Sequence, residues 1–206
     1  MASSGSFLDE QVFRVPPMGC APLESIGEAF LGMCAPQCLK EAQALDVLHL
    51  LEYVLPQHGI HVTPATPDEL DGREGATDPD GSRDIEILIA SNLWADLLAG
   101  GSHANRARAT VAHELSHAIL HVPVIRRRLT LQHSNPGLLL SRYRRGDLKP
   151  YEDPEWQAWT LAGAILLPRA TLAPKAGRIP VPQLASLFGV SDRMLVNHAR
   201  RMKIAL

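Results

Sequence analysis

The part of this sequence best suited to chemistry is a pair of histidines four residues apart. An acidic residue lies between them, directly after the first histidine. His113, Glu114 and His117 form the pattern H-E-x-x-H. On a helix, residues four apart are separated by about 40° around the axis and about 6 Å along it, so two such imidazoles can bind one metal ion. Glu114 lies beside this pair, where its carboxylate can reach a water molecule on the metal. The pattern therefore predicts half of a zinc site.

The reaction that needs this arrangement is hydrolysis of an unreactive amide. Three protein ligands leave one position of a tetrahedral Zn²⁺ open for water, and the ion lowers the pKa of that water to about 7. We expect His113 and His117 to bind the ion and Glu114 to act as general base, passing the proton to the leaving amine. The far side of the helix is apolar and can pack in a core, although a solvated His-Glu-His face is the alternative. Its apolar residues are Val111, Leu115, Ala118, Ile119 and Val122.

The third metal ligand is sought in a second helix, expected over residues 153–168. Asp153 is a suitable N-cap, Pro154 suits the first helical position, and Pro168 ends the pattern. Glu155 extends an apolar stripe on this helix, and a carboxylate facing a core is costly unless it is paired or bound to metal. Glu155 is therefore the expected third ligand. The alternative is that it only complements the positive end of the helix.

His121 is the main rival for the third position. It continues the row of His113 and His117 by one more turn. Three successive ligands at this spacing on one straight helix cannot easily converge on a single ion. We therefore expect His121 to lie in the core or to support a ligand from behind.

Composition limits the classes of protein to which the chain can belong. The 206 residues are 46% hydrophobic and carry 20 basic and 22 acidic side chains, which is typical of a globular protein. The net charge of −2 gives no overall reason to expect nucleic acid or an anionic membrane as partner. The apolar runs are too short to span a membrane, and the N-terminus does not resemble a secretion signal. With an odd number of cysteines, Cys20, Cys34 and Cys38, the chain is expected to be cytoplasmic and free of disulfides.

The chain divides into three parts on pattern and composition. We expect a flexible tail over residues 1–20, a main domain over 21–170 and a smaller C-terminal segment over 171–206. The strand expected just before the metal helix could bind an extended peptide at its edge. The other expected elements are helices near 23–33 and 39–55, strands at 59–63 and 84–90, a loop over 66–83 with a turn at 78–81, and a helix break at 100–103.

Two basic clusters and a further histidine follow the metal helix. The clusters Arg126–Arg128 and Arg142–Arg145 are expected to form a solvated face, with a patch for substrate or nucleic acid as the alternative. His133 lies in a turn-like segment and could donate to a transition state, although a surface position is the simpler expectation.

These motifs together resemble the ImmA/IrrE family of zinc metallopeptidases. The resemblance is carried by Arg108–His121 and by Glu155-x-x-Ala158 leading into Leu166–Pro168, and it extends to an upstream helix at Leu45–Pro56. It covers roughly residues 40–200. It implies Zn²⁺ as cofactor and a protein substrate, with His113, His117 and Glu155 as zinc ligands and Glu114 as general base.

The resemblance also implies a biological role and contains a departure. Members of the family typically cleave a helix-turn-helix repressor of the Xre/Cro type, and so derepress genes for stress, mobile elements or defence. This chain has Trp159 where the family usually has Asn, and Leu161 where it usually has Phe. Trp159 is one turn from Glu155, so we expect it to reshape the pocket or to remove a hydrogen bond that supports a ligand.

The C-terminal segment supports a competing hypothesis. Residues 181–201 resemble a helix-turn-helix unit, with a turn at Gly189 and Ser191 as cap. If it read DNA, the protein would be a transcriptional regulator, and a catalytically inactive, zinc-stabilised interaction module is a third alternative. The expected fold is α+β and zincin-like, mainly helical with a small sheet, ending in this helical pair. Its candidate base-reading residues are Arg193, Asn197, His198 and Arg200.

Overall fold

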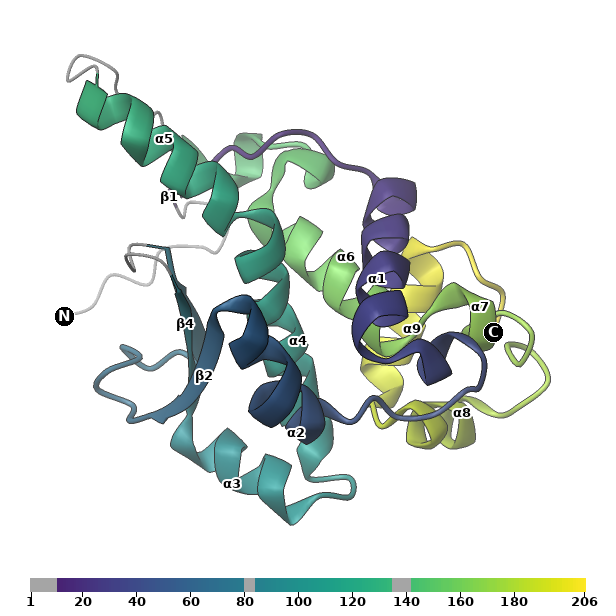
Figure 1. Ribbon diagram of the computed structural model, residues 1–206. Coiled ribbons are helices and arrows are strands. Elements are labelled where there is room, and N and C mark those ends of the chain that lie inside the picture. Colours follow the sequence, from purple (N-terminus) through teal and green to yellow (C-terminus); the bar gives the residue numbers. More distant parts are fainter. Residues whose placement is uncertain (1–10, 80–83, 135–141) are drawn as a thin grey trace, which may run out of the picture.

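The protein is a mixed α+β structure built around one central helix. The computed structural model describes residues 11–79, 84–134 and 142–206. Helix α4 (Ala104–Leu120) lies between a small sheet on one side and a group of helices on the other (Figure 1). That group includes α1 (Cys20–Cys34) and α6 (Pro154–Leu166), both of which agree with the helices expected from sequence. The helix that carries the H-E-x-x-H pattern is therefore at the core of the fold.

The sheet beside α4 has three strands in the order β2, β4, β3. Strand β2 (Ile60–Ala65) pairs in parallel with β4 (Ile85–Ala90), and β3 (Gly75–Asp78) pairs with β4 antiparallel. Ile87 and Ile89 on β4 are fully buried, as expected for a central strand. Helix α3 (Ser91–Ala99) follows β4 directly and packs on α4.

Strand β3 corrects two expectations from sequence. It lies inside residues 66–83, which composition predicts to be a loop, because Gly75-Ala-Thr-Asp78 lacks the apolar residues of a strand. Pairing with β4 and packing against α4 hold it in place instead. Strand β4 is consequently central and not at the edge, and the edge beside the metal helix belongs to β3. Residues 80–83, which include the second half of the expected turn, lie outside the described part of the chain.

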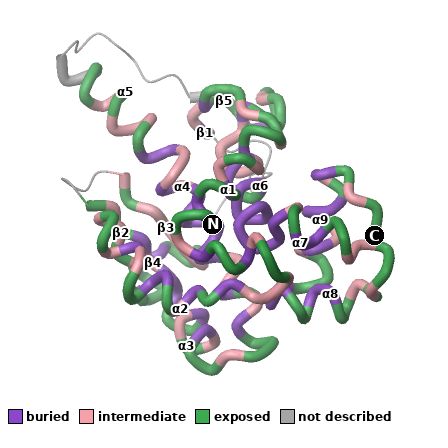
Figure 2. Tube along the Cα trace, turned by 45° about the vertical axis from the view of Figure 1, so that its right-hand side comes forward, coloured by how far each residue is buried: buried purple, intermediate pink, exposed green. Residues whose placement is uncertain are grey.

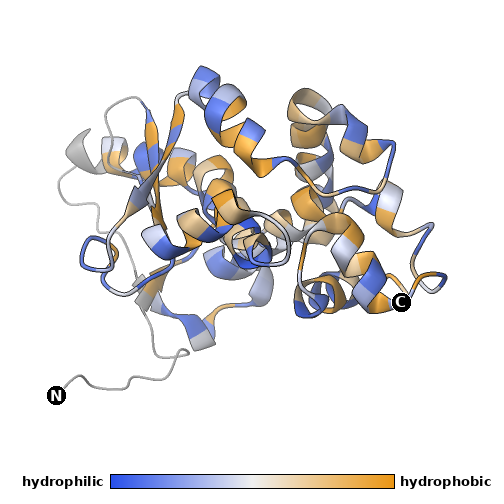
Figure 3. Ribbon diagram, turned by 90° about the horizontal axis from the view of Figure 1, so that it is seen from below, coloured by the Kyte–Doolittle hydropathy of each residue, from blue (hydrophilic) through white to orange (hydrophobic). Residues whose placement is uncertain are grey.

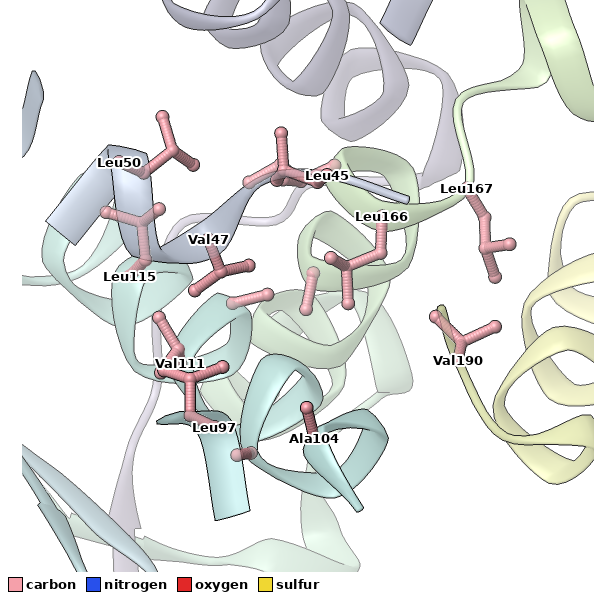
Figure 4. Close-up of a cluster of buried hydrophobic side chains, with 14 of the residues drawn as sticks. Leu45, Val47, Leu50, Leu97, Ala104, Val111, Leu115, Leu166, Leu167 and Val190 are labelled. Carbon is pink, nitrogen blue, oxygen red and sulfur yellow. The ribbon is translucent and has the colours of Figure 1, made fainter. Parts of the chain in front are cut away.

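The core joins α4 to α6 and to the irregular helix near residue 50. Val111 and Leu115 of α4 are buried, as is Leu166 of α6 (Figure 4). Figure 2 shows buried residues along both helices and exposed ones on the outer elements. In Figure 3, hydrophobic and hydrophilic positions alternate along most helices, as expected where each helix packs one face inward.

The helix expected over residues 39–55 is shorter and less regular than predicted. Asp46 caps it by accepting a hydrogen bond from the main-chain N–H of His49 at 3.0 Å, so its α-helical structure starts only after Asp46. A 3₁₀ turn η2 (Pro36–Leu39) lies at the start of this region, and a short α2 (Val47–His49), a π-helical turn η3 (Leu50–Val54) and a 3₁₀ turn η4 (Leu55–His58) follow Asp46.

Two further regions complete this part of the fold. Strand β1 (Gln11–Phe13), within the segment expected to be a tail, pairs antiparallel with β5 (Arg142–Arg144). The chain between α4 and α6 contains α5 (Val122–Ser134), η5 (Arg145–Asp147) and η6 (Pro150–Glu152).

The C-terminal elements pack on α6. Helices α8 (Val181–Phe188) and α9 (Asp192–Arg201) follow the short α7 (Arg169–Leu172), and the Ser191 hydroxyl caps α9 by accepting from the N–H of Met194 at 3.2 Å. Leu195 and Phe188 are fully buried. Within the described residues, no helix is both long enough and apolar enough to cross a membrane.

Candidate metal centre

Helix α4 brings both histidines of the motif to one side and buries the other side. Val111, Leu115 and Ala118 are at most 3% exposed, which confirms the apolar back expected from sequence. His113 and Glu114 are themselves buried, and His117 is half-buried. Imidazole and carboxylate groups at such depth need polar partners, because water cannot solvate them fully.

The first turn of α6 positions Glu155 opposite α4. Asp153 caps this helix by accepting from the N–H of Glu155 at 3.0 Å, and Pro154 follows it, as the sequence predicts. Arg145 Nε lies 3.7 Å from the carboxylate of Asp153. Arg145 is only 6% exposed and lines the cleft of the metal centre, so the expectation of a solvated basic face is wrong for this residue.

His113, His117 and Glu155 converge on one point. Nε2 of His113 lies 3.1 Å from Nε2 of His117, and the two carboxylate oxygens of Glu155 lie 3.1 Å from His113 Nε2 and 3.2 Å from His117 Nε2. Tetrahedral zinc, with bonds to nitrogen of about 2.0–2.1 Å, would place neighbouring ligand atoms about 3.3–3.4 Å apart. The three side chains therefore form a cluster of the right composition and size to hold a metal ion.

The electrostatics of Glu155 agree with this arrangement. Burial raises the pKa of its carboxyl, but the close contacts of the carboxylate with the imidazoles of His113 and His117 outweigh burial, and the pKa is lowered overall. Glu155 is consequently an anion at neutral pH, which is the form that binds a cation. Its alternative role, as a simple complement to the helix N-terminus, does not explain its contacts with both histidines.

A chain of hydrogen bonds behind His117 determines which of its nitrogens carries the proton. The side-chain NH₂ of Gln157 donates to the carbonyls of Pro16 (2.9 Å) and Tyr151 (2.8 Å), so its oxygen must accept. His121 Nε2 lies 3.3 Å from that oxygen and is therefore the donor, which leaves His121 Nδ1 as an acceptor. Nδ1 of His117, 2.9 Å away, then donates to it. Nε2 of His117 is left with a lone pair directed at the cluster.

His121 therefore supports a candidate ligand from behind. It is 3% exposed, and burial together with the neighbouring His117 lowers its pKa to about 4. A neutral imidazole can accept at Nδ1 while it donates at Nε2, as the network requires. Helix α4 ends at this point, and α5 begins at Val122.

Strand β3 holds the carboxylate of Glu114. The Thr77 hydroxyl lies 2.8 Å from Glu114 Oε2 and 3.0 Å from the main-chain oxygen of Glu114, so it can donate to either. The strand can approach this closely because residue 75 is glycine: a Cβ there would lie 2.8 Å from Cγ of Glu114. The sequence does not predict Gly75 or Thr77 as part of the site, since both lie in the segment that composition predicts to be a loop.

Trp159 occupies the position where the chain departs from the family that its sequence resembles. Its ring packs against the ring of His113 with centroids 4.2 Å apart and planes tilted by 34°. Nδ1 of His113 is buried without a hydrogen-bond partner among the described residues, and the indole N–H could not accept from it. Trp159 thus supplies an aromatic contact where the usual Asn would offer a polar one. The side chain of His133 lies outside the part of the structure that is described.

The cluster lies in an open cleft of about 470 Å³. Its walls come from β3, α4, α6 and the start of α5, and they include Glu114, Trp159 and the buried Arg145. A cleft that contains a metal cluster, an adjacent carboxylate and the edge of a sheet can hold a peptide next to the metal.

A mixed α+β fold with two histidines and a glutamate beside a second carboxylate has the features of a metallohydrolase centre. The family model described as the IrrE N-terminal-like domain of the M78 peptidases matches residues 97–199, which include the whole cluster. The chain belongs to this ImmA/IrrE family of metallopeptidases. No curated protein and no solved structure is significantly similar to it.

Proposed function

We propose that the protein is a zinc-dependent endopeptidase of the cytoplasm, with His113, His117 and Glu155 as zinc ligands and Glu114 as general base. The observation that carries this proposal is the close cluster of ligand groups, in which the two Nε2 atoms lie 3.1 Å apart and each lies 3.1–3.2 Å from one of the two carboxylate oxygens of Glu155. Beside it lies a carboxylate that Thr77 holds in place. The same proposal includes a division of the chain into a zincin-like domain over residues 21–170 and a helix-turn-helix-like scaffold over residues 171–206.

Each residue has a defined part in peptide hydrolysis. When bound, zinc supplies a Lewis acid that polarises the scissile carbonyl and acidifies a water molecule. Glu114 accepts the proton of that water and returns it to the leaving amine, which departs neutral. Edge strand β3 offers main-chain groups to an extended substrate, and the cleft walls exclude part of the solvent.

Thr77 is expected to be a positioning residue for Glu114. Thr77→Val keeps the shape of the side chain but removes the hydroxyl, so it should lower kcat about tenfold and leave zinc content unchanged. Thr77→Ser keeps the donor and should restore most of the activity. The measurement is kcat and bound zinc for the three proteins. Equal losses in the Val and Ser variants would show that the hydroxyl has no such role.

His121 is expected to strengthen zinc binding without touching the metal. His121→Leu removes the acceptor for His117 Nδ1 and should weaken zinc binding about 10–100-fold, as is typical for residues that orient a ligand. Competition with a chromophoric chelator would measure this. Glu155→Ala, measured in parallel, should weaken binding further. The reverse order would assign the third ligand to His121.

The proposed substrate is a helix-turn-helix repressor of the Xre/Cro type, and its cleavage would derepress stress, mobile-element or defence genes. Family membership supports this proposal. The test is expression of the wild type or Glu114→Gln in cells, followed by mass spectrometry of new protein N-termini. New termini in such a repressor, present only with the wild type, are expected. Their absence, or cuts confined to other classes of protein, would contradict the proposed substrate.

The position of α9 weakens the DNA-binding alternative. His198, one of its candidate base-reading residues, is 3% exposed and packs on α6, where a Cβ on Gly163 would lie 2.2 Å from its Nδ1. Burial and the charge of Arg201 lower the pKa of His198 to about 4, so it adds no positive charge at neutral pH. A second alternative, an inactive zinc-binding module, predicts that wild type and Glu114→Gln give the same protein termini.

A further inference from the structure

A second cavity adjoins the metal cleft and has no part in the chemistry described above. Its volume is about 720 Å³, and it lies between the first half of α4, α6 and α9. Glu74, Thr110 and Trp159 line both cavities, so the two lie side by side. A peptide that passes the metal along β3 can therefore extend into this second cavity.

The walls of this cavity carry more positive than negative charge. Arg106, Arg193 and Arg201 line it, and Glu74 is the one acidic residue among the described residues of its wall. Glu74 is already ion-paired with Arg106. His198 also lines the cavity but is neutral at neutral pH. The carboxylate of Glu74 therefore balances the charge of Arg106 but not those of the other two arginines.

The two remaining arginines come from α9. Arg201 is half-buried, and its guanidinium lies 5.6 Å from the centre of the Trp156 ring, so its position is fixed by packing. Arg193 is exposed at the rim, and no acidic partner is found for it in residues 11–79, 84–134 and 142–206. Both charges are thus available to an incoming anionic group.

Helix geometry sets the distance between this cavity and the scissile bond. Ala109 and Arg106 precede His113 by four and seven residues, or about 6 and 10 Å along α4. An extended peptide advances about 3.3 Å per residue. A substrate residue two to four positions from the bond at the metal therefore reaches this cavity.

We propose that this cavity is a substrate subsite that selects an acidic side chain, Asp or Glu, two to four residues from the scissile bond on one side. Arg193 binds the carboxylate, Arg201 adds positive charge to the same cavity, and Trp159 lies between the subsite and the metal. This inference rests on the proposed peptidase function and specifies the chemistry of its substrate.

The test compares Arg193→Glu with Arg200→Glu. Arg193 lies at the second position of α9, where an acidic residue is compatible with the helix N-terminus, so the variant should fold. Arg200 is also exposed on the same helix but does not line the cavity, which makes it the control. Bound zinc and thermal unfolding are measured first and should be unchanged in both variants.

Each zinc-loaded protein is then given a peptide library derived from a whole proteome, and cut sites are identified by mass spectrometry. The wild type and Arg200→Glu should prefer Asp or Glu about tenfold at one position two to four residues from the cut. Arg193→Glu should lose this preference. Cleavage by the wild type without it, or equal behaviour of both variants, would overturn the subsite and leave the peptidase intact.

Binding to the catalytically blocked protein separates the subsite from the peptidase function. Zinc-loaded Glu114→Gln is incubated with the same library, alone and combined with Arg193→Glu, and the retained peptides are identified. Acidic peptides retained only when Arg193 is present would support the subsite even if the wild type cuts nothing. Retention of peptides regardless of their acidic residues would overturn the subsite. Salt-dependent binding of duplex DNA that is lost in both arginine variants would also overturn it.

Discussion

Replacing Glu114 with glutamine should abolish cleavage and leave the metal in place. The amide has nearly the same shape as the carboxylate but cannot accept a proton from water, and positioned general bases contribute about 10²–10⁴-fold to the rate. Glu114 is not part of the candidate ligand cluster, so zinc content should match the wild type. The measurement is cleavage rate and zinc content on the same sample.

The Glu114→Gln variant should lose the general base without losing the hydrogen bond from Thr77. The Thr77 hydroxyl can still donate to the amide oxygen of a glutamine, so β3 should keep its position against α4. Glu114→Asp is a useful companion, because it keeps the carboxylate but withdraws it by one methylene. Loss of zinc in Glu114→Gln would show that Glu114 is a ligand and that the assigned roles are wrong.

Replacing Glu155 with alanine should remove most of the zinc affinity. Structural zinc sites bind with about 10–16 kcal/mol, so one ligand of four accounts for roughly 2.5–4 kcal/mol. That corresponds to about 10²–10³-fold in the dissociation constant. Chelator competition measures it. Asp153→Asn is the matched control, since it changes a carboxylate two residues away that caps α6 and is outside the cluster.

Loss of Glu155 should affect the metal more than the fold. Glu155 is only partly buried and sits in the first turn of α6, whereas Leu161 and Ile165 anchor that helix in the core. We therefore expect the metal-free variant to unfold at nearly the same temperature as the metal-free wild type. Equal zinc affinity in wild type and Glu155→Ala would contradict the assignment of the third ligand.

The sequence predicts the parts of the centre that depend on local pattern. The spacing of His113 and His117 follows from helical geometry, and Asp153 with Pro154 marks the start of α6 because capping is a local interaction. Glu155 could be singled out because a carboxylate on an apolar stripe conflicts with burial. The structure brings the side chains of His113, His117 and Glu155 together, and their roles as zinc ligands stay predictions.

The parts that sequence could not predict depend on tertiary contacts. Gly75 and Thr77 belong to a strand that exists because it pairs with β4 and packs on α4, and four small or polar residues give no local sign of it. The burial of Arg145 depends on its closeness to Asp153 in the folded chain. His198 looked available on an amphipathic helix, and only the contact with Gly163 shows that it faces α6.

The most direct test of the metal centre is elemental analysis of the wild type and Glu155→Ala, both purified without added metal or chelator. The account predicts about one zinc per wild-type chain and a sharp decrease in the variant. A wild type that holds no zinc, even after zinc is added back and excess removed, would contradict the assignment of His113, His117 and Glu155 as a zinc site.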